Sequence, residues 1–362
     1  MKKMYTKSTL IFSLLITCFS FVVNAQYDIT VAQDGSGNFT TVQAAINAAP
    51  SGQTVAYKIF IKKGKYREKV TIPSTKTFLY FIGESINETI ISWDDYSGKA
   101  GVTEIATVTI NANDCAFMSM TVENTWGRMN DGPQALAIKA NADRLIFKNC
   151  RFISGQDTVM AHGNGKRQYY NNCYIDGNTD YIYGSAIAAF DSCVIFSRDR
   201  TDGSTGGYLT AASTPPGQTY GYVFRNCLMP DNNGNTFYTL GRPWGNDVQP
   251  YTSETKVVFL NCRMGRTIVP ARWSPWSATT NTAVVTYAEY NSKYFNGNLV
   301  DLSGRVSWSQ EFNATQAAPY FVNSNLFGTW DPCAVLASAC VPLNPILSVS
   351  NVRVNRNSSD SL

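Results

Sequence analysis

The sequence predicts an all-β protein, a right-handed single-stranded parallel β-helix with a short capping helix at its N-terminal end. Of its 362 residues, 44% are hydrophobic and only 15% are charged, against about 25% charged in an average soluble domain. Its β-branched and aromatic segments are short and separated by Gly, Asn and Asp. A polar residue followed by Cys recurs after 35, 23, 20, 34 and 35 residues, at Cys115, Cys150, Cys173, Cys193, Cys227 and Cys262. One short unit repeated at such intervals indicates a solenoid.

The first 25 residues have the pattern of a secretory signal peptide. Three lysines occur among the first seven residues, and the apolar run Leu10 to Val23 follows them. This run is too short and too early for a stable membrane span, and the small residue Ala25 suits a cleavage site. A lipoprotein signal with Cys18 as the lipidated residue is the alternative. We expect removal near Ala25 and a secreted chain, extracellular or periplasmic, with no membrane segment in the mature form.

The formal charge of +4 belongs mostly to this leader. Removing residues 1–25 takes away three lysines and no acidic residue, so 27 basic residues remain against 26 acidic ones and the mature charge is +1. A nearly neutral chain lacks the basic patch that nucleic-acid binding requires. We therefore expect no nucleic-acid partner, and we expect a monomer.

The helix and the ends of the solenoid follow from the local pattern. Long amphipathic helical patterns are missing except at Val42 to Ala49, which we expect to cover the first coil. Short strands are expected at, for example, 58–61, 107–110 and 256–260. The solenoid domain is predicted to span 26–343, and residues 344–362 to form a polar C-terminal tail.

The cysteines support an exported β-helix. Eight remain after cleavage, and an even number in an exported chain permits disulfides. Equivalent residues of stacked coils lie about 4.8 Å apart, so most of these cysteines are expected to be small, buried core residues. Two disulfides are hypotheses: Cys173 with Cys193, one coil apart, and Cys333 with Cys340, which would close a C-terminal loop.

Common catalytic motifs are absent from the sequence. There is one histidine, His162, and no Gly-x-Ser-x-Gly elbow for a serine hydrolase. No Walker loop, dinucleotide fingerprint or Cys-x-x-Cys pair is present. His162 lies in a turn-rich stretch, where we expect a structural role or a place at the rim of a substrate site.

Two aspartates form the candidate catalytic pair. Asp157, in Gln-Asp-Thr, and Asp180, in Asp-Tyr-Ile-Tyr-Gly, are 23 residues apart, which is the step from Cys150 to Cys173. Adjacent coils would place the two carboxylates side by side, although Asp residues on turns are often only solvated or capping. Neighbouring like charges push two pKa values apart. The pair would then offer a nucleophile or base beside an acid.

Four further residues complete the candidate site. Gln156 precedes the first aspartate and Gln134 lies one coil earlier, and amide donors beside a carboxylate pair can stabilise an oxyanion. Arg242 has the planar fork that holds a carboxylate ionised. Trp244, in Leu-Gly-Arg-Pro-Trp, provides a face on which a sugar can stack.

At these residues the sequence resembles the pectin methylesterase family. The resemblance begins at Asp-Gly-Ser-Gly-Asn-Phe-Thr-Thr-Val-Gln-Ala-Ala (34–45) and continues through Gly-x-Tyr-x-Glu (64–68) and Val-Glu-Asn-Thr (122–125). The Gln-Ala, Gln-Asp-Thr, Asp-Tyr-Ile-Tyr-Gly and Leu-Gly-Arg-Pro-Trp segments follow in the family's order. The resemblance implies a parallel β-helix and a carboxylic ester hydrolase. Its substrate would be methyl-esterified pectin (homogalacturonan), from which it removes the methyl ester of the galacturonate C6 carboxyl, releasing methanol and pectate.

The resemblance also implies a role for each catalytic residue. Asp180 would be the nucleophile that forms an acyl-enzyme, and Asp157 would protonate the departing methanol and then act as base for water. Gln134 and Gln156 would line the oxyanion site, and Arg242 would hold Asp180 in place and ionised. No metal or organic cofactor is implied.

For substrate binding, we expect Trp244 and Trp273 to stack on pyranose rings and Tyr181 to contact the substrate. Tyr181 and Tyr183 stand where the family usually has Phe, which adds hydroxyl groups near the subsites. These departures concern the shape of the subsites and leave the catalytic set and the reaction type in place.

Three other functions are open to the sequence. A pectate lyase or polygalacturonase could share the β-helix, and a lyase would need calcium and a basic residue as its base. A thioesterase-like branch would act on acyl-CoA. A non-catalytic adhesin or polysaccharide-binding module would tolerate the loss of Asp180 without consequence.

Overall fold

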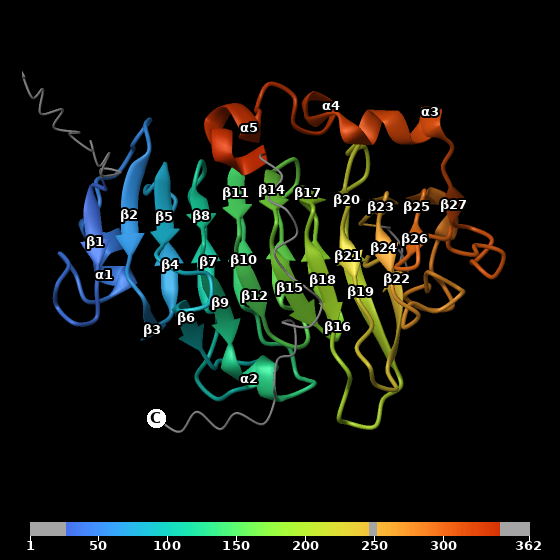
Figure 1. Cartoon of the computed structure of the whole chain (residues 1–362), viewed down its shortest axis with the longest axis horizontal. Coiled ribbons are helices and arrows are strands. Elements are labelled where there is room, and N and C mark those ends of the chain that lie inside the picture. Colours follow the sequence, from blue (N-terminus) through green and yellow to red (C-terminus); the bar gives the residue numbers. More distant parts are fainter. Residues whose placement is uncertain (1–26, 246–251, 341–362) are drawn as a thin grey trace, which may run out of the picture.

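The chain folds into a β-helix that consists of three long parallel sheets. The computed structural model describes residues 27–245 and 252–340, so the expected leader and polar tail lie outside the described residues. Every pairing between the named strands is parallel, and each sheet takes one strand from successive coils. Figure 1 shows these strands stacked along the long axis of the molecule. The predicted parallel β-helix is confirmed.

Within each sheet the strands lie side by side in the order of the chain. The 11-stranded sheet consists of β1 (Ile29–Val31), β2 (Tyr57–Ile61), β5 (Leu79–Gly83), β8 (Ala116–Met118), β11 (Leu145–Lys148), β14 (Arg167–Asn171), β17 (Ile187–Asp191), β20 (Tyr222–Arg225), β23 (Lys256–Leu260), β25 (Thr286–Tyr290) and β27 (Gln310–Glu311). The 9-stranded sheet consists of β3 (Gly64–Arg67), β6 (Thr89–Trp93), β9 (Thr121–Asn124), β12 (Arg151–Ile153), β15 (Tyr174–Gly177), β18 (Val194–Ser197), β21 (Leu228–Met229), β24 (Arg263–Met264) and β26 (Lys293–Tyr294). The 7-stranded sheet consists of β4 (Val70–Ile72), β7 (Val108–Ile110), β10 (Ile138–Ala140), β13 (Val159–Ala161), β16 (Thr179–Gly184), β19 (Gly206–Ala212) and β22 (Phe237–Gly241).

The helices of the described chain are short. They are α1 (Val42–Ala48), α2 (Thr125–Met129), α3 (Ala314–Ala317), α4 (Asn323–Phe327) and α5 (Pro332–Val335), with the 3₁₀ helices η1 (Thr282–Val284), η2 (Ala318–Phe321) and η3 (Ala337–Cys340). None of the helices in the described ranges is long and apolar enough to cross a membrane.

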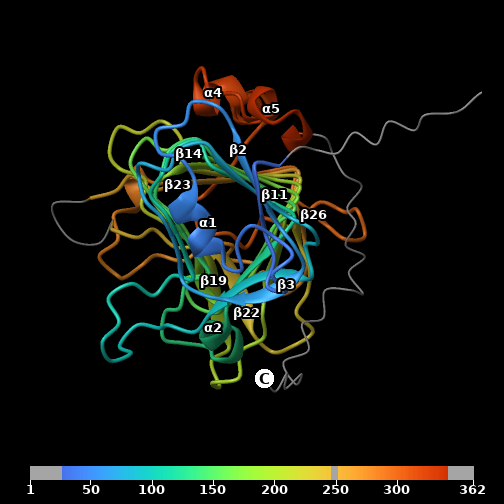
Figure 2. The ribbon, with the colours of Figure 1, turned by 90° about the vertical axis from the view of Figure 1, so that its left-hand side faces the viewer.

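Helix α1 covers the first coil, as predicted. The Thr41 hydroxyl caps its N-terminus by accepting a hydrogen bond from the backbone N–H of Ala44 at 3.2 Å, which satisfies a donor that the first turn leaves without a partner. Val42, Ala45 and Ile46 are buried on one side of the helix. Figure 2 shows α1 lying across the open end of the solenoid, where it shields the first rung of the core from water.

The polar residue before five of the six recurring cysteines forms the turn between the 11-stranded and 9-stranded sheets. Its backbone is left-handed, with φ between 51° and 56°, at Asn149, Asn172, Ser192, Asn226 and Asn261. Asn tolerates this conformation better than most residues. The cysteine that follows points into the core, and its thiol donates to a carbonyl of the preceding coil, at 3.3 Å from Cys150 to Phe117 and from Cys227 to Phe190. The repeat therefore marks a turn followed by a buried rung.

Cys115 does not share this turn. Ala116 pairs with Ile146 and Met118 pairs with Lys148, so Met120 rather than Cys115 aligns with Cys150. Cys115 lies at the earlier turn that leads into β8. The expectation of one setting for all six cysteines was wrong for this residue, because a polar residue at left-handed φ precedes both kinds of turn.

One predicted disulfide is present and the other is not. Cys333 and Cys340 are bonded, with their Cα atoms 5.3 Å apart. Cys173 and Cys193 are buried, free thiols, so the prediction of a bond between them was wrong. Instead of a disulfide, each thiol donates a hydrogen bond to a carbonyl of the preceding coil, Cys173 to Phe147 and Cys193 to Tyr170.

A stack of aromatic rings runs through the core beneath the 11-stranded sheet. Neighbouring ring centroids are 4.4 to 5.8 Å apart. The stack consists of Phe81, Phe117, Phe147, Tyr170, Phe190, Phe224 and Phe259. Offset-stacked pairs of this kind add to the free energy of burial.

We expect the Phe190→Ala variant to lose about 3 to 5 kcal/mol of unfolding free energy, because truncation leaves a cavity between two rings that cannot collapse. Equilibrium unfolding in urea measures this loss. The matched control is Phe295→Ala, since Phe295 is 40% exposed, and its effect should stay within about 0.5 kcal/mol. Equal effects of the two variants would contradict a tightly packed stack.

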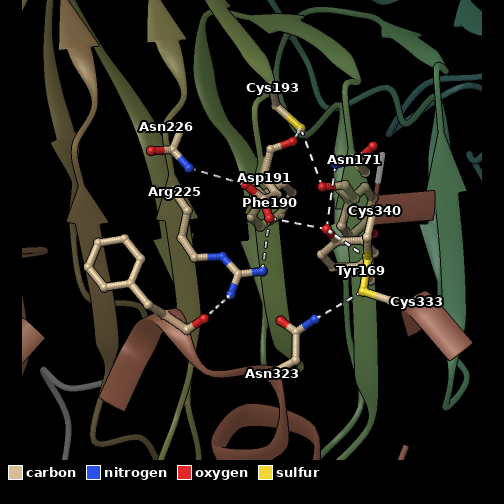
Figure 3. A network of polar contacts seen from close by, with 12 residues as sticks. Tyr169, Asn171, Phe190, Asp191, Cys193, Arg225, Asn226, Asn323, Cys333 and Cys340 are labelled. Carbon is tan, nitrogen blue, oxygen red and sulfur yellow. Dashed lines mark hydrogen bonds and ion pairs between the residues drawn. A yellow bond between two sulfur atoms is a disulfide. The ribbon is translucent and has the colours of Figure 1, made fainter. Parts of the chain in front are cut away.

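The C-terminal helices fold back over the outer face of the 11-stranded sheet (Figure 1). Leu326, Phe327 and Trp330 are buried there against outward-facing residues such as Tyr169. A polar network continues this contact (Figure 3): Arg225 pairs with Asp191 at 3.1 Å and donates to the carbonyl of Phe321 at 3.3 Å. The Tyr169 hydroxyl donates to Asp191 at 3.1 Å, and the disulfide borders this hydroxyl, with Cys340 Sγ 3.6 Å away. Sequence reasoning did not predict these helices.

Candidate active site

The predicted catalytic residues converge on one pocket at the 7-stranded sheet. The pocket has a volume of about 250 Å³. Its lining consists of Gln134, Gln156, Asp157, Asp180, Tyr183, Ala211, Arg242, Trp244 and Trp276. The structure thus brings together the two aspartates, the two glutamines, the arginine and the first tryptophan from coils that are far apart in the sequence.

Unusual backbone conformations place the two aspartates. Asp157 has φ 66° and Asp180 has φ 49°, in the left-handed region that non-glycine residues seldom adopt. The N–H of Asp157 donates to the carbonyl of Thr179 at 3.0 Å, which ties the two coils together at this point. The pairing of β16 with β19 shifts between Thr179 and Ile182, so β16 is bulged where it carries Asp180. Such local strain persists only where the surroundings enforce it, and it is common at functional sites.

Arg242 forms a two-point ion pair with Asp180. Its Nε donates to Oδ1 at 3.0 Å and its Nη2 donates to Oδ2 at 2.6 Å. The guanidinium lies between two rings, 3.9 Å from the centroid of Tyr208 and 4.1 Å from that of Trp276. Cation–π contacts on both faces hold its plane in the orientation that the fork requires.

The two carboxyl groups differ in their affinity for a proton. Burial raises the pKa of Asp180, which is 5% exposed, and the hydrogen bonds and charge of Arg242 oppose that rise. Burial raises the pKa of Asp157 well above its ordinary value, the negative charge of Asp180 raises it further, and Arg242 lowers it only in part. The site therefore keeps a proton on Asp157 at a pH where Asp180 is ionised.

The two glutamines reach the pocket from adjacent coils. Gln156 directly precedes Asp157, and Gln134 leads toward β10. The N–H of Ala135 donates to the carbonyl of Gln156 at 3.2 Å, so the two segments are held side by side. Both amides line the pocket beside the carboxyl groups.

Tyr181 does not contact the pocket. It is fully buried in the core, where its hydroxyl lies 2.9 Å from the hydroxyl of Ser197. The expected substrate contact is therefore wrong for Tyr181, and Tyr183 lines the pocket instead. The physical reason is the bulge in β16, which breaks the alternation of side chains after Asp180 so that Tyr181 and Ile182 both enter the core.

Trp273 is also buried, with 1% of its surface exposed, and its ring packs 4.4 Å from that of Tyr287. Its expected stacking on a sugar ring is therefore wrong. Trp276 lines the pocket in its place. Sequence reasoning missed this residue. Residues three apart in an extended segment point to opposite faces, but this spacing does not tell which of the two tryptophans faces the pocket.

His162 lies outside the lining of this pocket. Its Nδ1 is 3.2 Å from the hydroxyl of Ser185, and burial lowers its pKa. Within 27–245 and 252–340, no group of three or more His, Cys, Asp or Glu side chains is arranged to hold a metal ion.

Together, the solenoid and its pocket define a class of protein, a parallel β-helix with a paired-aspartate site beside an arginine. Comparison with known proteins gives the family. The pectinesterase family model matches residues 28–329. The chain is 32% identical to Pectinesterase 31 of Arabidopsis thaliana over 308 residues, which cover 82% of this chain and 91% of that protein. The chain belongs to the pectinesterase family.

Other relatives are longer than this chain. The probable pectinesterase/pectinesterase inhibitor 13 of Arabidopsis thaliana is 36% identical over 83% of this chain, but the chain spans only 48% of its length.

Solved structures agree in fold along nearly their whole length. The pectin methylesterase from carrot has a TM-score of 0.76 at 28% identity, covering 88% of this chain and 98% of that one. The pectin methylesterase from Erwinia chrysanthemi has a TM-score of 0.71 at 28% identity, covering 85% and 98%.

Proposed function

We propose that this protein is a carboxylic ester hydrolase that removes methyl esters from the galacturonate C6 carboxyl of pectin. The observation that carries the proposal is the two-point ion pair of Asp180 with Arg242, in one pocket with Asp157, whose pKa is raised well above its ordinary value by burial and by the charge of Asp180. Membership in the pectinesterase family supports it. So does a related pectin methylesterase that was solved in complex with a hexasaccharide.

In the first half of the proposed reaction, an oxygen of Asp180 attacks the ester carbonyl carbon. The negative charge moves onto the carbonyl oxygen, where the amides of Gln134 and Gln156 donate to it. When the bond to the methoxy oxygen breaks, Asp157 gives its proton to that oxygen and methanol leaves. The product is an acyl-enzyme, an anhydride between Asp180 and the sugar carboxyl.

In the second half, water attacks the same carbonyl carbon. Asp157, now a carboxylate, takes the proton from this water, which restores its starting state. The bond to Asp180 breaks, and the galacturonate carboxyl and a free Asp180 carboxylate are released. Arg242 remains bound to Asp180 throughout and stabilises its negative charge whenever that charge returns.

Substrate binding is assigned to the aromatic rings that line the pocket. Trp244 is 37% exposed, and Tyr183 packs against it at a tilt, with ring centroids 5.9 Å apart. Apolar ring faces suit the C–H faces of a pyranose. With Trp276, these rings surround the carboxyl groups and would hold a sugar whose ester faces Asp180.

We also propose the organisation of the whole chain. Residues 1–25 would be a signal peptide removed near Ala25, residues 26–343 the β-helix domain and residues 344–362 a tail. The mature protein would then be a secreted monomer that acts on pectin without a metal or an organic cofactor.

The test is methanol release from highly methylated pectin, with and without a chelator, while the absorbance of unsaturated products is followed. We expect methanol release that the chelator does not change and no rise in absorbance. Unsaturated products that disappear with the chelator would identify a calcium-dependent lyase and overturn the proposal. Pectin binding with neither product would identify a binding module.

A further inference from the structure

A fully buried ion pair lies next to the segment that carries Trp276, one of the residues that line the pocket. Arg272 and Glu289 are each 1% exposed, and the guanidinium donates to the carboxylate at 2.8 Å from Nε and 2.7 Å from Nη2. Arg272 also has φ 64°, a conformation that is costly for a long side chain. The protein thus places two charges and a strained residue in its core.

The position of Glu289 makes this arrangement unusual. In the 11-stranded sheet Phe259 pairs with Glu289, so the carboxylate occupies the next rung of the aromatic stack. A seventh phenylalanine could continue the stack there without the desolvation of two charges. Because replacing a buried ion pair with packed apolar side chains is often neutral or stabilising, stability alone does not explain the pair. Departures from local rules of this kind concentrate at functional sites.

The ion pair anchors the segment that borders strand β22. This strand is the last one in the order of the 7-stranded sheet, so its free edge would lack partners. Residues 267–274 provide them. Residues 267–269 pair with the first part of the strand through Tyr238, and residues 272–274 pair with its end: Leu240 N–H donates to the carbonyl of Arg272 at 2.6 Å, and Ser274 N–H donates to the carbonyl of Gly241 at 3.1 Å. Gly241 and Trp273 also form a bridge.

The anchored segment reaches Arg242 in two ways. Arg242 directly follows Gly241, the end of β22, so its backbone position depends on that supported edge. Trp276, four residues after Arg272, places its ring 4.1 Å from the Arg242 guanidinium. The backbone position of Arg242 and one of the two aromatic contacts of its guanidinium therefore depend on where the segment lies.

We propose that Arg272 and Glu289 are positioning residues for the ester hydrolysis: their buried ion pair holds Arg242 in its two-point contact with Asp180. The proposal rests on the proposed function. A loosened Arg242 would compensate less of the cost of burying the Asp180 charge. Since ionised Asp180 is the nucleophile, the fall of activity toward low pH would then begin at a higher pH.

The experiment measures kcat, KM, the pH profile of kcat/KM and the melting temperature for Glu289→Gln, Arg272→Gly and the double variant. Glycine adopts the left-handed φ of residue 272 freely, and the double variant leaves no unbalanced buried charge. For all three variants we expect kcat to fall about tenfold and KM to change by no more than about twofold. We also expect the acid limb of the pH profile, the fall of kcat/KM toward low pH, to lie about 0.5 to 1 pH unit higher. Arg272→Lys keeps the charge without the fork and should give a smaller shift.

The matched control is Asp191→Asn, which breaks the Arg225 pair on the 11-stranded sheet (Figure 3). It should lower the melting temperature and leave the acid limb in place. If the double variant regains both the melting temperature and the acid limb of the parent, the pair is only structural and the inference is wrong. If the parent itself releases no methanol from methylated pectin, the proposed function fails instead.

Discussion

The Asp180→Asn variant should lose methanol release from methylated pectin by on the order of 10⁴-fold or more, the size of loss seen when a nucleophile or its partner is removed from a hydrolase. The amide is a poor nucleophile and cannot form the anhydride. It has nearly the size of the carboxyl group, so the left-handed backbone and the fold should persist. Methanol release at saturating pectin measures the loss, and a pectin-binding assay checks that the groove remains intact.

Asp191→Asn is a suitable control for this variant because Asp191 is also a strand aspartate bound to an arginine, at 3.1 Å from Arg225. It lies on a different sheet and should keep the parent rate. An Asp180→Asn protein that releases methanol at the parent rate would contradict the nucleophile assignment. An inactive variant that has also lost pectin binding would point to a damaged groove, and circular dichroism would distinguish the two.

Much of the fold was predictable because the β-helix repeats a local rule. A residue that accepts left-handed φ, followed by a small buried one, recurs at Asn149, Asn172 and Asn226, and this spacing is visible in the sequence. The C-terminal helices were not predictable in this way. They have four or five residues each, too few for a helical period, and they are held by buried tertiary contacts such as those of Phe327 and Trp330.

The candidate site was also predictable only in part. Asp157 and Asp180 could be paired from the sequence because their spacing equals one coil, and adjacent coils keep register along the sheet. Tyr181 and Trp273 were assigned to the wrong face because facing depends on details that spacing does not encode. A bulge in β16 determines the facing of Tyr181. The facing of Trp273 depends on a segment anchored by a buried ion pair that only the tertiary structure brings together.

In the proposed mechanism, the surroundings of the two aspartates make one an acid and the other a nucleophile. Both are carboxyl groups on neighbouring coils, yet only Asp180 is bound by Arg242. Burial favours the neutral form of both, and the arginine opposes that preference chiefly at one. Under the proposed mechanism, a single cation therefore gives two chemically identical groups different roles, because it makes their environments unlike.

The Asp157→Asn variant should lose about 10² to 10⁴-fold in kcat, the usual contribution of a general acid and base. Asparagine cannot protonate the departing methoxide or take a proton from water. The pH profile should change in a particular way. In the parent, activity should fall as rising pH removes the proton from Asp157, and it should fall at low pH as Asp180 becomes protonated. The variant should lose the alkaline limb and keep the acid one, which a pH series of methanol release would record.

Combining the two substitutions provides the sharper test of this assignment. If Asp157 acts only on the reaction that Asp180 begins, the double variant Asp157→Asn/Asp180→Asn should be no slower than Asp180→Asn alone, because residues that act as a unit are not additive. Losses that multiply would mean that Asp157 serves a reaction route independent of Asp180. An alkaline limb that survives in Asp157→Asn would assign the proton transfer to another group. Tyr183 would then be the first residue to test, because it carries a hydroxyl group and lines the same pocket.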